Sequence, residues 1–317
     1  MPHQTVALKE RLQYLGLAIL TVFNTYVCAS LVAAALAPLS DHQLLLNTVP
    51  LLCATLIVTA LTVALLPRGS WPRIGLGRGV SRGVTVGLVL GFIACGELLL
   101  VVVLFGLAEW VPIADGALRF DFRAAPGLGL SLLVIGATAE ELFARGLALQ
   151  CLARALGPVG AVILTSLGFA ALHGANPGVT FLAACNTALF GAVFGVAVFR
   201  QRSLWLATGL HIGWNVAQVA LGVNVSGITM RLTEFNLRLG QPDWITGGDY
   251  GFEGGLLATR TALGLLAAAW WIPASTRAAP MLWDAPREDA GTLTSGLGGI
   301  ARTSGDEPGD PIGERED

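Results

Sequence analysis

The chain has 317 residues, of which 54% are hydrophobic and 13% are charged, and its formal net charge is −2. A soluble globular protein carries charge at about a quarter of its positions, so this composition excludes an ordinary soluble enzyme and a disordered protein. No basic cluster of the kind that binds nucleic acid is present. The five cysteines lie in or beside apolar stretches without a Cys-x-x-Cys pair, and we expect them to be small hydrophobic residues buried in the fold rather than disulfide partners.

Apolar runs of about 20 residues are long enough to cross a bilayer as helices. The sequence contains eight such runs, near residues 12–37, 44–66, 83–108, 127–150, 158–174, 178–199, 203–222 and 255–273. The first is too long, and lacks the small-residue cleavage pattern, to be a removable signal peptide. The sequence therefore predicts an all-α fold, a polytopic membrane helix bundle with about eight transmembrane helices.

Basic residues beside short loops predict the orientation, because cytoplasmic loops are enriched in arginine and lysine. Such residues occur in three of the predicted connections. The connection between the second and third helices contains Arg68, Arg73, Arg78 and Arg82, the one between the fourth and fifth contains Arg154, and the one after the sixth contains Arg200 and Arg202. All three connections fall on one side if eight helices alternate. We expect that side to be cytoplasmic and to hold both termini, in the plasma membrane of a bacterium.

Ionisable side chains inside a membrane helix are costly unless they face the bundle interior, so they mark candidate functional positions. The fourth predicted helix contains Glu140, Glu141 and Arg145. Glu141 and Arg145 are four residues apart and share a face, which favours an ion pair. Glu140 projects about 100° away from Glu141 and is free to point elsewhere.

Two further helices carry polar residues at a spacing of four, Phe169 with His173 and His211 with Asn215. A turn at 157–158, which is Gly-Pro, makes the fourth and fifth helices antiparallel. Glu140 and His173 then lie at nearly the same height, within about 3 Å along the axis. His211 is expected about 13 Å from the turn near Arg202, whereas Glu140 is expected about 25 Å from the turn at Gly157. His211 and Glu140 can then lie at the same depth only if the hairpin of the fourth and fifth helices protrudes or if a helix tilts.

These three patterns together resemble the CAAX-protease and bacteriocin-processing (Abi) family of intramembrane endopeptidases. The matching runs are Glu140-Glu141-Leu-Phe-Ala-Arg145-Gly146, Phe169-Ala-Ala-Leu-His173 and His211-Ile-Gly-Trp-Asn215. The resemblance covers about 127–222 and implies that Glu140 and His173 activate a water. It also implies that His211 and Asn215 stabilise the oxyanion, and that Glu141 and Arg145 hold or orient the site.

The resemblance implies hydrolysis of a peptide bond in a membrane-associated protein or peptide. The expected partners are this substrate and the lipid bilayer, and no nucleic acid is expected to bind. No cofactor is favoured. Zinc is the alternative, because two histidines and a carboxylate, here Glu140, His173 and His211, are a catalytic zinc ligand set. The His-Glu-x-x-His helix that usually carries such a set is absent. Two other functions stay open: a non-proteolytic immunity or scaffold protein that keeps the fold, and a transporter that relays protons through Glu97 and Glu140.

The motifs divide the chain into four parts. These are 1–126 with the first three helices, 127–222 as the catalytic four-helix core, 223–277 as a non-cytoplasmic loop and the last helix, and 278–317 as an acidic tail predicted to be disordered.

Several further residues, inside and outside the motifs, are interpreted as structural. We expect Glu97 to be an interior partner, for example of Arg145, and Asp249 and Glu253 to be solvated loop charges rather than a cation site. Phe169 and Trp214 are expected to pack, and Asn186 and Asn224 to make helix or loop contacts.

Overall fold

The computed structural model describes residues 8–40, 42–66, 69–77, 79–113, 120–273 and 281–284. Within these ranges, eight helices have 16 residues or more: α1 (Leu8–Leu36), α2 (Gln43–Leu65), α3 (Val80–Leu104), α4 (Pro126–Arg145), α5 (Leu147–Leu172), α6 (Phe181–Gln201), α7 (Trp205–Ala220) and α9 (Leu256–Trp271). A short helix, α8 (Asp243–Thr246), precedes α9. Five helical segments, with α4 and α5 counted as one, are long and apolar enough to cross a membrane. The predicted all-α membrane bundle is confirmed.

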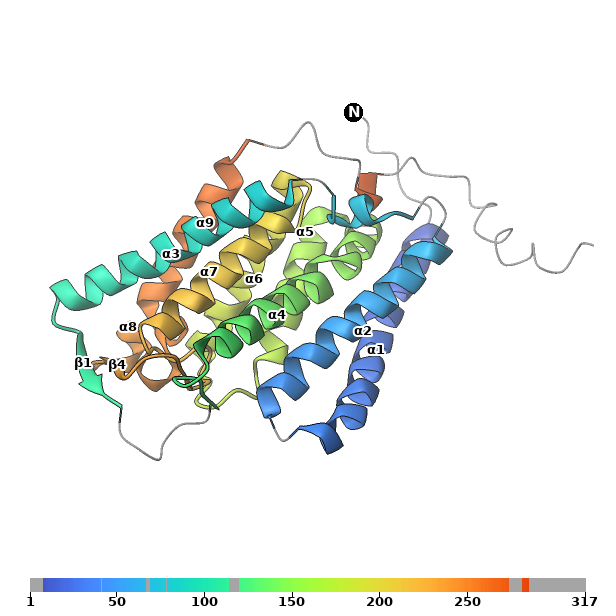
Figure 1. Cartoon of the computed structure of the whole chain (residues 1–317). Coiled ribbons are helices and arrows are strands. Elements are labelled where there is room, and N and C mark those ends of the chain that lie inside the picture. Colours follow the sequence, from blue (N-terminus) through green and yellow to red (C-terminus); the bar gives the residue numbers. More distant parts are fainter. Residues whose placement is uncertain are drawn as a thin grey trace, which may run out of the picture. The chain divides into compact units, whose positions relative to one another are not determined.

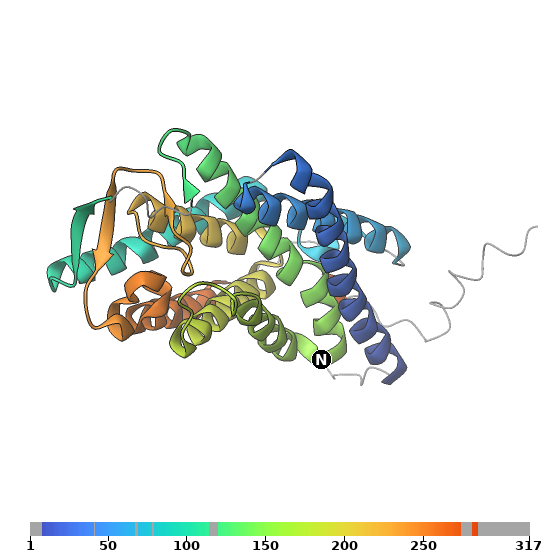
Figure 2. The same cartoon turned by 90° about the horizontal axis from the view of Figure 1, so that it is seen from below.

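The helices α4 to α7 form the middle of the bundle. In Figure 1, α1 and α2 lie together on one side of it, and α3 and α9 lie on the other. The view from below in Figure 2 shows the same arrangement. The main apolar core is built from α3, α5, α6, α7 and α9, and it includes Leu98, Phe194 and Trp214. Cys95 and Cys151 are buried as expected, whereas Cys185 is exposed, and all five cysteines are free.

The boundary between the fourth and fifth helices differs from the prediction. Helix α4 ends at Arg145 instead of continuing to residue 150, because Gly146 leaves the helical conformation with ψ of −122°. A second break lies within α5 at Gly157, whose φ of 83° is in the left-handed region that favours glycine. The Gly-Pro pair therefore interrupts a helix, and it is Gly146 that ends α4.

Two small sheets, which the sequence did not predict, tie the segment after α3 to the segment after α7. Strand β1 (Ala108–Pro112) pairs antiparallel with β4 (Phe235–Leu239), from Ala108 opposite Leu239 to Pro112 opposite Phe235. Strand β2 (Phe120–Asp121) pairs parallel with β3 (Met230–Arg231). Strands of two to five residues are too short to show an alternating pattern in an apolar sequence.

Residues 281–284 of the predicted disordered tail pack against the bundle. Met281 and Leu282 are buried, and Asp284 forms an ion pair with Arg202. The apolar run at 281–283 gives this short segment a face to bury. The remainder of the predicted tail lies outside the described residues.

Glycines allow α3 and α7 to pack at backbone distance. A Cβ added to Gly87 or Gly91 of α3 would lie 2.4 Å from Leu206 O or 2.5 Å from Trp214 N, respectively. The converse holds on α7, where a Cβ at Gly209 or Gly213 would meet the backbone of α3 at 2.3 or 2.5 Å. Both helices thus carry the Gly-x-x-x-Gly spacing that brings membrane helices together.

We predict that Gly91→Ala destabilises the bundle, because the added methyl group forces α3 away from α7. Overpacking of this kind costs about 1–3 kcal/mol. The matched control is Gly96→Ala in the same helix, where the added Cβ meets no atom within 4 Å. Thermal unfolding in detergent should show a lower midpoint for Gly91→Ala only, and equal midpoints for the two variants would contradict the packing argument.

Candidate active site

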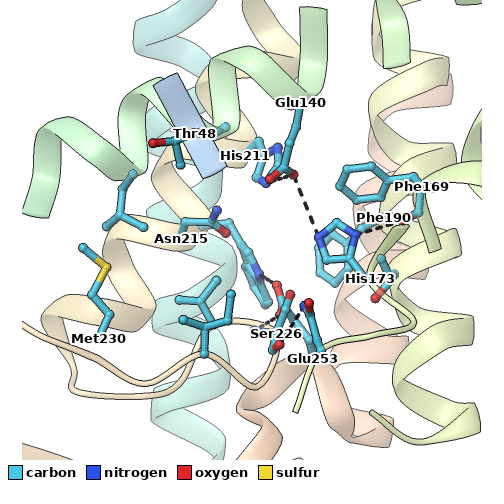
Figure 3. Close-up of a pocket in the computed structure, with 18 of the residues that line it drawn as sticks. Thr48, Glu140, Phe169, His173, Phe190, His211, Asn215, Ser226, Met230 and Glu253 are labelled. Atoms are coloured by element: carbon cyan, nitrogen blue, oxygen red, sulfur yellow. Dashed lines mark hydrogen bonds and ion pairs between the residues drawn. The ribbon is translucent and has the colours of Figure 1, made fainter. Parts of the chain in front are cut away.

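Three helices bring one carboxylate and two imidazoles together. Glu140 comes from α4, His173 directly follows α5, and His211 lies in α7. The Oε2 atom of Glu140 is 3.9 Å from Nε2 of His173 and 3.8 Å from Nε2 of His211. This oxygen is buried and has no hydrogen-bond partner among the described residues. Figure 3 shows the Glu140 side chain reaching into the cavity toward His173.

The second nitrogen of each imidazole is already held by an acceptor. Nδ1 of His173 lies 2.8 Å from the carbonyl oxygen of Phe169, and Nδ1 of His211 lies 3.0 Å from Oε1 of Glu141. Both acceptors require a proton on Nδ1, since a carbonyl or carboxylate oxygen does not donate. In a neutral ring Nε2 is then an acceptor, so both unprotonated nitrogens face Glu140.

The ion pair expected between Glu141 and Arg145 is present, and both side chains are fully buried. Nη1 of Arg145 lies 3.2 Å from Oε1 of Glu141, and its Nη2 donates to the carbonyl of Gly191 at 3.1 Å. The guanidinium also lies over the rings of Phe169 and Phe194, at 4.4 and 5.3 Å from their centroids. Phe169 therefore packs, as expected, but its ring also covers a buried charge.

The predicted mismatch in depth between Glu140 and His211 does not occur. It assumed that α4 continues to the Gly-Pro turn, but α4 ends at Arg145. Glu140 is consequently only five residues, or about 8 Å, from the end of its helix. His211 is six residues, or about 9 Å, from the start of α7 at Trp205. The two residues therefore lie at similar distances from these two helix ends, and their side chains approach to 3.8 Å.

The site opens into a cavity of about 110 Å³. Besides Glu140, His173 and His211, its walls include Asn215, one turn after His211 on α7. None of the hydrogen bonds among the described residues uses the Asn215 side chain, which Figure 3 places in the cavity. The rest of the lining is mainly apolar: Leu44 and Thr48 of α2, Leu132, Leu133, Gly136 and Ala137 of α4, and Val225, Ile228 and Met230 beyond α7.

Glu253 corrects the expectation of a solvated loop charge, because it is buried and lines the same cavity. Its carboxylate accepts hydrogen bonds from Trp214 Nε1 at 2.8 Å and from the backbone N–H and hydroxyl of Ser226 at 2.7 and 2.6 Å. Burial and this neighbouring carboxylate raise the pKa of Tyr250. Trp214 is thus more than a packing residue, while Asp249 is exposed as expected.

The pair expected between Glu97 and Arg145 does not form. Glu97 forms an ion pair with Arg260 of α9 and accepts a hydrogen bond from Thr261 at 3.0 Å. The reason is that α3 packs against α7 and α9, away from the face of α4 that carries Arg145.

The two asparagines behave as helix and loop contacts. Asn186 donates to the carbonyls of Glu253 and Gly255, and Asn224 donates to that of Asp249.

We predict that Arg145→Ala strongly destabilises the protein, because it leaves the Glu141 carboxylate buried without its cation. Breaking a buried ion pair costs about 3–5 kcal/mol. The control is Arg260→Ala, which removes a half-exposed pair and should cost about 0–1 kcal/mol. Thermal unfolding of the purified variants in detergent measures both, and an Arg145→Ala midpoint near that of Arg260→Ala would contradict the structural role of the pair.

Comparison with protein families gives one match. The model of the family described as Type II CAAX prenyl endopeptidase Rce1-like matches residues 122–217, the segment that contains α4 to α6 and most of α7. Searches of curated proteins and of solved structures found no match. The match and the apolar helices support an integral membrane protein with endopeptidase activity. The matched segment contributes Glu140, His173 and His211 to one cluster, and in this segment the chain is similar to the CAAX protease family.

Proposed function

We propose that the protein is an intramembrane endopeptidase in which Glu140 and His173 activate a water for direct attack on a peptide bond. The observation that carries this proposal is the spacing of the cluster. Separations of 3.8 and 3.9 Å are too long for direct hydrogen bonds, but they allow one water to bond to the carboxylate and an imidazole at about 2.8 Å each.

The groups that are free to contact a substrate in the cavity support a role for each residue. Glu140 accepts a proton from the water as a general base, and the proton passes to the leaving amine. The carbonyl oxygen of the substrate gains negative charge, which needs donors. The free amide of Asn215 supplies one. His211 supplies the other when it is doubly protonated, because Nδ1 then donates to Glu141 while Nε2 donates into the cavity.

An acyl-enzyme route is not favoured by the lining residues. The hydroxyl of Ser226 donates to Glu253 at 2.6 Å and faces neither histidine. The described lining contains no cysteine. Direct attack by water therefore uses the groups that are free in the cavity.

The spacing of the donor atoms gives no support to a zinc ion at this site. Ligand atoms of a tetrahedral zinc with bonds of about 2.0–2.1 Å lie about 3.4 Å apart, closer than the spacing found here. Among the described residues, no group of three histidine, cysteine or acidic side chains is arranged to hold a metal ion.

We predict that Glu140→Gln lowers peptide cleavage by about a hundredfold to ten-thousandfold, because the amide cannot act as the base. The matched control is Glu97→Gln, which changes another glutamate of the bundle that makes no contact with the cluster. The measurement is quantitative comparison of membrane peptides from cells that express each variant, with thermal unfolding to verify folding.

Cleavage that survives in folded Glu140→Gln would overturn the proposal. If the biological effect of the protein also persisted, the non-proteolytic immunity or scaffolding function would be supported instead. The pairing of Glu97 with Arg260 gives no reason to favour a proton relay from Glu97 to Glu140.

We predict that a chelator leaves cleavage by the purified protein unchanged and that added zinc does not increase it. Activity is titrated against chelator after dialysis, and zinc is then returned in excess. Loss of activity on chelation with recovery on zinc addition would replace the water mechanism by the zinc alternative at Glu140, His173 and His211.

A further inference from the structure

The two ends of the helix bundle can be told apart by the contacts that hold each together. At one end, Arg154 pairs with Glu10 at the start of α1, and Leu204 N–H donates to Gly75 O between α2 and α3. Arg200 at the same end donates to Ile272 O after α9. At the other end, Leu107 accepts from Gly240, and Asn176 donates to Ser226 O. Figure 1 shows these ends at opposite extremes of the helices.

The ends carry opposite charge, and we call them the basic end and the acidic end. The described residues of the basic end comprise seven basic side chains (Lys9, Arg11, Arg73, Arg82, Arg154, Arg200, Arg202) and two acidic ones (Glu10, Asp284). Those of the acidic end comprise three basic side chains (Arg123, Arg231, Arg238) and six acidic ones (Glu109, Asp121, Glu234, Asp243, Asp249, Glu253). An excess of arginine and lysine marks the cytoplasmic side of a membrane protein, so the basic end is expected to be cytoplasmic.

Buried side chains fill the side of the cluster that faces the basic end. Beyond Glu140 on α4 lie Glu141 and Arg145, both fully buried, with the rings of Phe169 and Phe194 against the guanidinium. Gln150, in the next helix, is fully buried as well. Glu141, Arg145 and Gln150 therefore lie buried on the side of the cluster that faces the basic end, and none of the three lines the cavity.

The cavity extends instead toward the acidic end. Its wall on α4 is made by residues that precede Glu140, and its wall on α2 by Leu44 and Thr48 near the start of that helix. Val225, Ile228 and Met230 line it beyond the end of α7. The segment that follows His173 is exposed at the same end, including Ala175.

We propose that the cavity is entered from the non-cytoplasmic side of the membrane. The substrate is then a polypeptide that has crossed the membrane and presents its scissile bond, next to an apolar stretch, at the outer face. This substrate class rests on the proposed endopeptidase function, whereas the side of entry does not.

Single cysteines and a membrane-impermeant maleimide test the side of entry in spheroplasts of an expressing bacterium and in sealed inverted vesicles. Ala175→Cys reports the acidic end and Ser81→Cys the basic end, both at exposed positions, while Thr48→Cys reports the cavity itself. Labelling of the wild-type chain, whose own five cysteines are free, is subtracted as the baseline. We expect Ala175→Cys and Thr48→Cys to label in spheroplasts only, and Ser81→Cys in inverted vesicles only.

Labelling of Ser81→Cys in spheroplasts would overturn the orientation. Labelling of Thr48→Cys from inverted vesicles alone, or from neither side, would overturn the entry route even if the orientation holds. The same cysteines combined with Glu140→Gln should label identically, since access does not require catalysis. Failure of the entry proposal is therefore distinguishable from failure of the proposed protease function.

Discussion

The arrangement depends on one buried carboxylate. Oε1 of Glu141 contacts both the guanidinium of Arg145 and Nδ1 of His211, and the side chains of Glu141 and Arg145 are fully buried. A buried charge is costly without a partner, so the pair must form if the helices are to pack. Because the same oxygen also orients His211, assembly of the bundle and orientation of the site are a single event.

The position of α7 is set by a different constraint, its close contact with α3. His211 lies between Gly209 and Gly213, whose missing side chains admit the backbone of α3. Hydrogen bonds from Trp214 to Glu253, and from Ser226 to the same carboxylate, hold the end of α7 to the loops before α9. The helix that carries His211 and Asn215 is thus fixed by segments outside the region matched by the family model.

Hydropathy and motif spacing predicted the membrane bundle and the residues that meet in its cavity, because both depend on short-range patterns. The end of α4 was missed because Gly146 lies within an apolar run and glycine alone does not decide where a helix stops. Burial of Glu253 could not be predicted, since its donors on Trp214 and Ser226 are distant in sequence. The pairing of Glu97 with Arg260 was missed for the same reason. Contacts between distant residues depend on helix packing, which a single sequence does not record.

The residues of α2 that line the cavity lie on a different helix from the residues that orient the two histidines. Leu44 and Thr48 line the cavity, but they belong to a helix outside the region matched by the family model. Neither residue takes part in the hydrogen bonds that orient the two histidines. Selectivity can consequently diverge by substitution in α2 while the reactive groups stay constant. Related proteins with the same chemistry and different first helices would then process different polypeptides.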